Sequence, residues 1–203
     1  MPRVVDKQKK AAEIADAALE VFRQRGYHAT RMTDVAEAAG VGKGTLYEYF
    51  RNKADILHAS FDSFFEAFEQ GALEAIGNAG GPGDRLLALV RFALSHVREW
   101  ERHCSVYVDY FGVQRDERDG PFSLSAFYDR FGALLGQLVE QAQSAGEIRR
   151  EFDPRLVAEL LLAMYDGVIL HRIFHGHERR SDELIPTALS ILAAGLLASE
   201  SHG

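Results

Sequence analysis

Residues 33–53 have the sequence TDVAEAAGVGKGTLYEYFRNK, which predicts a helix, a tight turn, a second helix and the start of a third. Thr33 is a good N-cap residue, and Asp34 follows it where the helix dipole favours a negative charge. Gly40 suits the left-handed conformation that ends a helix, and Gly42 can cap the next one. This length and order are those of a helix-turn-helix, which places its second helix in the major groove of DNA.

The second of these helices has one apolar face and one polar face. Leu46 and Phe50 are four residues apart, so we expect both side chains to point inward. The other faces carry residues suited to DNA, since Lys and Tyr hold phosphates, Thr contacts a phosphate or a thymine methyl, and Gly admits a close backbone. These residues are Lys43, Gly44, Thr45, Tyr47 and Tyr49. For the two tyrosines the alternative is ordinary helix amphipathicity.

The third helix is predicted to begin at Lys53, because Asn52 and Asp55 have the spacing of a capping box. A lysine in the first turn opposes the helix dipole. Either Lys53 is simply solvated, or it binds one phosphate together with the helix N-terminus; the preceding motif favours the second interpretation. Arg31 is either a contact to the DNA backbone or a solvated side chain.

An amphipathic helix is also predicted before the motif, over residues 7–25. Its apolar stripe has helical spacing and consists of Ile14, Ala18, Val21 and Phe22. Together the three helices form a DNA-binding unit of about fifty residues.

Residues 8–57 resemble the DNA-binding domain of the tetracycline-repressor (TetR) family of transcriptional regulators. The resemblance is carried by the run IADAALEVFRQRGYHATRMTDVAEAAGVGKGTLYEYFRNKADIL, with its F-x-x-x-G-Y, its A-x-x-A-G-V turn and its G-T-x-Y-x-x-F recognition helix. The chain departs from the family at Gly42, where Ser is common, and at Tyr49, where His is common. The resemblance implies DNA contacts from Thr33, Lys43, Thr45, Tyr47, Tyr49 and Lys53.

Composition places this unit in a larger protein without an obvious secretion signal. The chain has 203 residues, which is enough for a DNA-binding domain at 1–53 and a second domain at 54–203. A single cysteine excludes an internal disulfide and favours a reducing compartment. Because the sequence has neither a signal-peptide pattern nor an apolar run long enough for a membrane, we expect a cytoplasmic protein.

The net charge of −7 is unevenly distributed. Residues 1–53 hold 10 Lys and Arg against 7 Asp and Glu, and they include all five lysines. Phosphate affinity depends on such a local patch rather than on the total charge. The cluster Arg3, Lys7, Lys9 and Lys10 is predicted to form a mobile basic arm, which either contacts DNA or only aids solubility.

The remainder is predicted to be helical throughout, so the fold class is all-α. No alternating strand pattern occurs, and residues 77–83 form a glycine-rich loop. The predicted helices are 53–76, 84–103, 105–114, 122–145, 154–175 and 182–199.

The last two predicted helices, 154–175 and 182–199, are apolar over more than one face. A helix of that kind needs two partners, which we expect to be the domain core and a second subunit. The family resemblance implies the same arrangement, a homodimer in which these helices form a four-helix bundle.

The resemblance also implies that the second domain binds a small-molecule effector. An aromatic and mainly apolar pocket would suit a hydrophobic molecule. The candidate lining residues are Trp100, Cys104, Tyr107, Phe111, Phe127, Phe131, Met164 and Tyr165. For any single one of them an ordinary core role is the favoured alternative.

Two further groups of residues are of types that could carry chemistry, a set of histidines and one aspartate. His171 and His175 share a helix face, but the sequence lacks the Glu of a hydrolytic metal motif, so neither a metal nor a cofactor is predicted. Asp166 lies in an apolar run, where it either forms a hydrogen bond at the dimer seam or in the core, or meets a polar group of the ligand.

These observations predict a ligand-responsive regulator, in which a dimer represses from a pseudo-palindromic operator until a small hydrophobic molecule releases it. Activation instead of repression stays open. The alternatives are a helical binding protein without DNA affinity and an enzyme. An enzyme is disfavoured because the sequence offers no nucleophile–base pair, phosphate loop or metal cluster.

Overall fold

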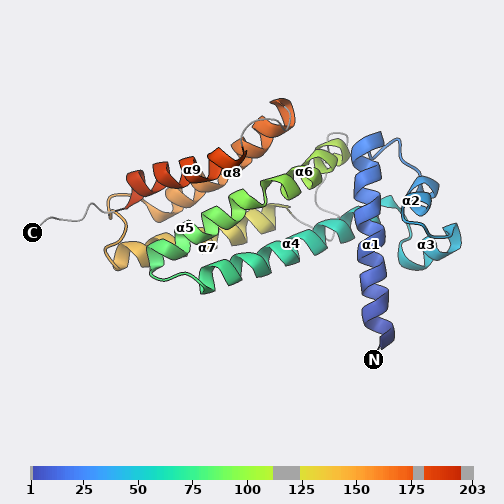
Figure 1. The fold of residues 1–203 in the computed structure, drawn as a ribbon, viewed down its shortest axis with the longest axis horizontal. Coiled ribbons are helices and arrows are strands. Elements are labelled where there is room, and N and C mark those ends of the chain that lie inside the picture. Colours follow the sequence, from blue (N-terminus) through green and yellow to red (C-terminus); the bar gives the residue numbers. More distant parts are fainter. Residues whose placement is uncertain (1, 112–123, 176–180, 198–203) are drawn as a thin grey trace, which may run out of the picture. The chain divides into compact units, whose positions relative to one another are not determined.

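The computed structural model describes residues 2–111, 124–175 and 181–197. For residues 2–6, 111, 175, 181 and 182 it describes the backbone alone. These described ranges form nine helices (Figure 1): α1 Pro2–Arg25, α2 Met32–Ala38, α3 Lys43–Tyr49, α4 Lys53–Gly77, α5 Pro82–Ser95, α6 Val97–Phe111, α7 Leu124–Ser144, α8 Pro154–His175 and α9 Ser181–Leu196. The predicted all-α class is confirmed.

No helix in the described ranges is both long enough and apolar enough to cross a membrane.

The chain divides into two compact units. The first comprises Met1–Phe68 and Glu101–Ser123, and the second comprises Glu69–Trp100 and Leu124–Gly203. Helices α4 and α6 therefore each contribute residues to both units. The predicted boundary after residue 53 falls inside the first unit, and as a division of function it stays a prediction.

Helix α1 begins at Pro2 rather than at Lys7, so the prediction of a mobile basic arm is wrong for Lys7, Lys9 and Lys10. Proline is tolerated in the first turn of a helix, where its missing N–H would have had no partner. Within the helix, the ammonium of Lys10 lies 3.1 Å from the Glu13 carboxylate, one turn further on.

The predicted helices 84–103 and 105–114 are wrong in their boundary, because the break lies at His96. The Phe92 carbonyl lies 2.7 Å from the Ser95 hydroxyl and 2.8 Å from the His96 ring nitrogen Nδ1. Such local side-chain bonds compete with the helical ladder. The backbone N–H of His96 bonds to the Ala93 carbonyl, one residue nearer than in an α-helix.

Each unit has its own apolar core. In the first unit, Phe22, Leu46 and Ile56 from α1, α3 and α4 are buried. In the second, the core is built from α5, α7 and α8, with Leu89 and Val139 fully buried. These cores hold the helices that present the functional surfaces.

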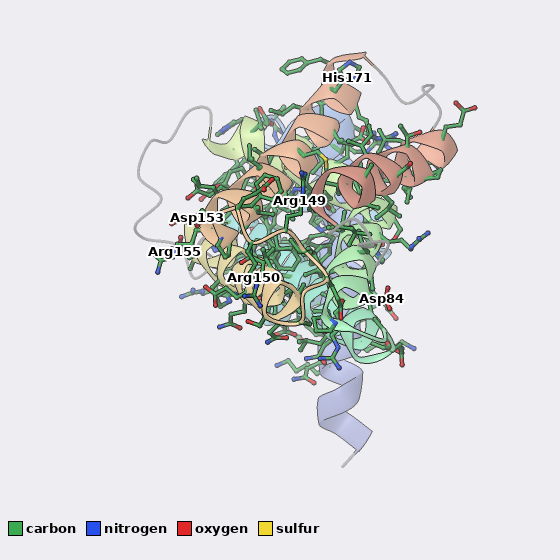
Figure 2. All side chains as sticks on the ribbon, turned by 90° about the vertical axis from the view of Figure 1, so that its left-hand side faces the viewer. Asp84, Arg149, Arg150, Asp153, Arg155 and His171 are labelled. Atoms are coloured by element: carbon green, nitrogen blue, oxygen red, sulfur yellow. The ribbon has the colours of Figure 1, made fainter. Side chains whose placement is uncertain are left out.

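Helix α8 begins as predicted, with Pro154 at its first position. The Asp153 carboxylate caps it by accepting a hydrogen bond from the backbone N–H of Arg155 at 2.8 Å (Figure 2).

Candidate nucleic-acid interface

The helix-turn-helix is formed by α2 and α3 with the turn that the sequence predicts. Gly40 adopts a φ of +62°, and the N–H of Val41 bonds back to the Ala36 carbonyl at 3.0 Å, which closes the end of α2. Gly42 is the N-cap of α3 and makes no side-chain bond there. The predicted roles of both glycines are confirmed.

The predicted N-cap at Thr33 is wrong, since α2 begins at Met32 with Arg31 as its cap residue. Arginine has no side-chain acceptor. The Asp34 carboxylate instead accepts a hydrogen bond from the Arg31 backbone N–H at 2.8 Å. Thr33 consequently lies in the first turn of α2, where its side chain is exposed.

Helix α3 buries the two side chains that its spacing indicates, Leu46 and Phe50. Its other faces are accessible. Tyr47 is 47% exposed, and Tyr49 is half-buried with its ring centroid 5.8 Å from the Lys7 ammonium of α1. The remaining predicted contacts on this helix are also exposed: Lys43, Gly44 and Thr45. A short helix thus presents cationic, hydroxyl and backbone groups together, as a DNA-reading helix requires.

Helix α4 begins at Lys53, as predicted, and Asn52 caps it by accepting the Asp55 N–H at 2.9 Å. In a capping box the Asp55 carboxylate would in turn accept a hydrogen bond from the backbone N–H of Asn52, and here its partner is the preceding residue. The Asp55 carboxylate accepts a hydrogen bond from the backbone N–H of Arg51 at 3.2 Å, and it also pairs with the Arg51 guanidinium.

The ammonium of Lys53 is held by the loop between α1 and α2. It donates to the carbonyl oxygens of Tyr27 at 2.6 Å and of His28 at 3.3 Å, and it lies 4.6 Å from the centre of the Tyr27 ring. Burial lowers the pKa of Lys53, and the nearby Asp109 charge opposes that shift. Of the three ammonium hydrogens, at most one is left for a phosphate. The phosphate contact stays a prediction, beside this structural role.

The same loop is held by the end of α6, which sequence reasoning missed. The Asp109 carboxylate accepts a hydrogen bond from the Tyr27 backbone N–H at 2.6 Å, and the Asp109 carbonyl lies 3.1 Å from the His28 ring nitrogen. The Tyr110 ring meets the Tyr27 ring edge-on, with centroids 4.8 Å apart. Because 82 residues separate Tyr27 from Asp109, no local pattern predicts this contact.

The predicted ligand-pocket residues are divided between the two compact units. Trp100 is buried, and Phe127 and Phe131 are buried in the second unit with their rings stacked 5.5 Å apart. The Tyr107 ring lies 5.7 Å from Phe61 within the first unit. Cys104, Met164 and Tyr165 are partly buried, whereas the Phe111 side chain lies outside the described residues. Their ligand role stays a prediction.

A cavity of about 260 Å³ lies elsewhere in the second unit. It is lined by the end of α5, the start of α6, α8 and α9. Its apolar walls come from Leu94, Val97, Val168, Leu184 and Ile185, and its polar groups from Ser95, Arg98 and Arg172. None of the eight predicted ligand residues is among the described residues that line it.

Asp166 on α8 accepts a hydrogen bond from the Tyr128 hydroxyl at 2.5 Å. Burial raises the pKa of this carboxyl, and the bond from Tyr128 partly counters the rise. The predicted hydrogen bond within the domain therefore exists, and it joins α7 to α8.

His171 lies on the exposed side of α8 (Figure 2), and the side chain of His175 lies outside the described residues. Among the residues that the structure describes, no group of three His, Cys, Asp or Glu side chains has the arrangement of a metal site.

Two family models match the chain. Residues 14–60 match "Bacterial regulatory proteins, tetR family", and residues 82–197 match "BetI-type transcriptional repressor, C-terminal". The second match alone covers more than half of the 203 residues.

Individual proteins are similar to this chain, in sequence or in structure, along nearly its whole length. The fatty acid metabolism regulator protein of Bacillus subtilis is 24% identical over 190 residues, which cover 94% of this chain and 97% of that protein. A transcriptional regulator of Saccharomonospora viridis, solved in complex with choline, has a TM-score of 0.79 at 19% identity, covering 94% and 99% of the two chains. AibR, solved with isovaleryl coenzyme A and operator DNA, has a TM-score of 0.69 at 22% identity, covering 90% and 97%.

Proposed function

The chain belongs to the TetR family of bacterial transcriptional regulators, and we propose that it is a repressor whose dimer leaves its operator when a small molecule binds. Its relatives are DNA-binding regulators rather than enzymes. The observation that carries the proposal is the exposed face of α3, with Lys43, Thr45 and Tyr47 around a glycine backbone.

The proposed contacts divide by chemistry. Lys43 and Tyr49 would hold phosphates, Thr45 and Tyr47 would reach a phosphate or a base edge, and Gly44 would let the backbone of α3 approach. The flanking helices would add two contacts to the DNA backbone, one from Thr33 in α2 and one from Lys53 in α4. The ammonium of Lys53 donates two hydrogens to backbone carbonyls, so its third hydrogen would make the contact to DNA.

We propose that dimerisation uses α8 and α9, because both carry large apolar side chains on their surfaces. Leu160 and Phe174 of α8 are 70% and 77% exposed, and Ile191 of α9 is 66% exposed. Covering such side chains contributes about 25 cal/mol for each Å² of apolar surface removed from water. A twofold dimer would present two copies of α3, which would read half-sites about 34–36 Å apart.

Effector release would use the two helices that contribute to both compact units, α4 and α6. The effector must bind one placement of these helices more tightly than the other, since only differential affinity shifts an equilibrium. Relatives support a small-molecule effector, because AibR was solved with both isovaleryl coenzyme A and operator DNA.

The test measures DNA binding directly. Duplexes are selected from a random pool with the full-length protein, and affinity is then measured by fluorescence anisotropy at several salt concentrations. We expect affinity to fall steeply with salt and Tyr47→Ala to weaken binding, whereas Glu48→Ala, on an exposed neighbour of the same helix, should not weaken it. Salt-independent binding, or equal losses in both variants, would refute the interface.

A further inference from the structure

The first turns of α1 carry a cluster of positive charge. Residues 7–10 have the sequence KQKK, with three lysines and no acidic residue. Because α1 begins at Pro2, these lysines occupy fixed positions on a helix. The side chains of Lys7 and Lys9 are exposed, and neither forms an ion pair among the side chains that the structure describes. Lys10 differs, since it pairs with Glu13.

Helical geometry directs Lys7 toward α3. Lys7 lies seven residues before Ile14, and two turns of a helix return a side chain to almost the same face. Ile14 is fully buried in the core of the first unit, so Lys7 continues the core-facing stripe of α1 out to solvent. Its ammonium lies 5.8 Å from the centre of the ring of Tyr49, the last residue of α3. Lys9 is about 200° from Lys7 around the helix and lies on the opposite side.

The Tyr49 ring places the charge of Lys7 next to the polar surface of α3. A cation within about 6 Å of an aromatic ring centre is attracted to the face of the ring, and such a contact restricts a long and flexible side chain. Thr45 lies one turn before Tyr49 on α3 and is exposed. The ammonium of Lys7 therefore extends the exposed surface of α3 by one cation.

A DNA phosphate is the partner that this arrangement fits. DNA carries one negative charge for about every 1.7 Å of its axis, and a lysine that neutralises a phosphate releases counterions. Lys7 is continuous with the surface of α3, so it would meet a phosphate beside the groove that α3 enters. We propose that α1 is a further DNA-contacting helix, in which Lys7, positioned by Tyr49, binds a backbone phosphate of the operator. This inference rests on the proposed function, because it adds a helix to the same interface.

The salt dependence of DNA binding tests the contact. The affinity of the full-length protein for the selected duplex is measured by fluorescence anisotropy between about 50 and 200 mM salt. Lys7→Gln removes the charge and preserves the helix propensity. We expect it to reduce the slope of the logarithm of the binding constant against the logarithm of salt concentration by about 0.9 for each subunit. Affinity should fall by up to about fivefold for each subunit, as for a surface ion pair. An unchanged slope would overturn the proposal.

Lys9→Gln is the matched control, because it removes the same charge from the opposite side of the same helix. We expect its slope to stay close to that of the unmodified protein. Equal changes in Lys7→Gln and Lys9→Gln would mean that only the total charge matters, and they would refute a phosphate contact at Lys7.

Variants of Tyr49 test the positioning role of the ring. Tyr49→Phe keeps the ring, and Tyr49→Leu removes it. We expect Lys7→Gln to lower DNA affinity as much in the Tyr49→Phe protein as in the unmodified one, and to have a smaller effect in the Tyr49→Leu protein. An equal effect of Lys7→Gln in both backgrounds would overturn the positioning by Tyr49.

Tyr47→Ala is measured on the same duplex, so that the two proposals can be separated. Salt-independent binding by the unmodified protein would contradict the proposed function and this inference with it. Steep salt dependence and a loss of affinity in Tyr47→Ala, together with an unchanged slope in Lys7→Gln, would contradict the role of α1 alone.

Discussion

Replacing Gly44 by alanine should stabilise the helix-turn-helix and weaken its binding to DNA. Gly44 is the second residue of α3, and a Cβ atom built on it meets nothing within 4 Å. Alanine is favoured over glycine in a helix by about 0.5–1 kcal/mol, chiefly because glycine loses more backbone freedom on folding. We therefore expect the free energy of unfolding to rise by about that amount.

The effect on DNA affinity should have the opposite sign. Gly44 lies on the exposed face of α3, between Lys43 and Thr45, where we propose that the backbone approaches the DNA. A methyl group forced into a packed contact typically costs about 1–3 kcal/mol. This corresponds to a loss of DNA affinity of roughly 5- to 150-fold for each DNA-binding domain of the dimer. Misfolding cannot produce a more stable protein that binds DNA more weakly, so the two measurements together isolate the contact.

Gly40→Ala is the matched control, because its Cβ also meets nothing within 4 Å. The two positions differ in backbone conformation, because Gly40 has a φ of +62°. A left-handed conformation costs a residue with a Cβ about 1–2 kcal/mol, so Gly40→Ala should destabilise the protein. Urea unfolding should show opposite shifts for the two variants, and anisotropy at fixed salt reports DNA affinity. Binding of Gly44→Ala as tight as that of the unmodified protein would refute the close approach, and a destabilised Gly44→Ala would refute the helix argument.

Three further changes have defined outcomes. Lys43→Ala should reduce the slope of the logarithm of the DNA-binding constant against the logarithm of salt concentration by about 0.9 for each DNA-binding domain, as measured by anisotropy. An unchanged slope would exclude a phosphate contact. Leu160→Glu should give a monomer in light scattering, because it places a charge on the proposed dimer surface; Glu159→Ala, its exposed neighbour, should not. The pKa of Asp166 is raised by burial, so the folded protein favours the protonated carboxyl. The stability that this group contributes is therefore fully present below its unfolded pKa of about 3.9, and it is lost as the pH rises through the folded pKa. Asp166→Asn should therefore exceed the unmodified protein in stability at pH 7, and that excess should shrink toward pH 4; a constant difference would contradict the assignment.

The parts of the fold that the sequence predicts correctly are those decided by neighbouring residues. Gly40 ends α2 because it alone of its neighbours tolerates the left-handed backbone without strain, and Asn52 caps α4 through a bond to a residue three positions away. Leu46 and Phe50 point inward because helical spacing fixes their direction. Each of these signals lies within one helical turn.

The errors occur where two local solutions compete or where distant segments meet. Thr33 and Asp34 can both satisfy the start of α2, and the carboxylate does so from inside the helix. The break at His96 depends on two side chains that share the Phe92 carbonyl, which hydrophobic spacing does not reveal. The burial of Arg172 has no sequence signal, because an arginine near the end of a helix is usually solvated.

Helix α6 contributes residues to both compact units as a single element. Its first turn supplies Arg98 to the cavity of the second unit, and its last turn supplies Asp109, which accepts the Tyr27 N–H in the first. Leaving a partly buried N–H without its acceptor costs about 1–3 kcal/mol, which corresponds to roughly 5- to 150-fold in DNA affinity for each subunit in which this bond breaks. A ligand transmits no more than its differential affinity for the two states of α6. A release much larger than this range would therefore need a second route, and α4, whose Lys53 holds the same loop, is the element placed to supply it.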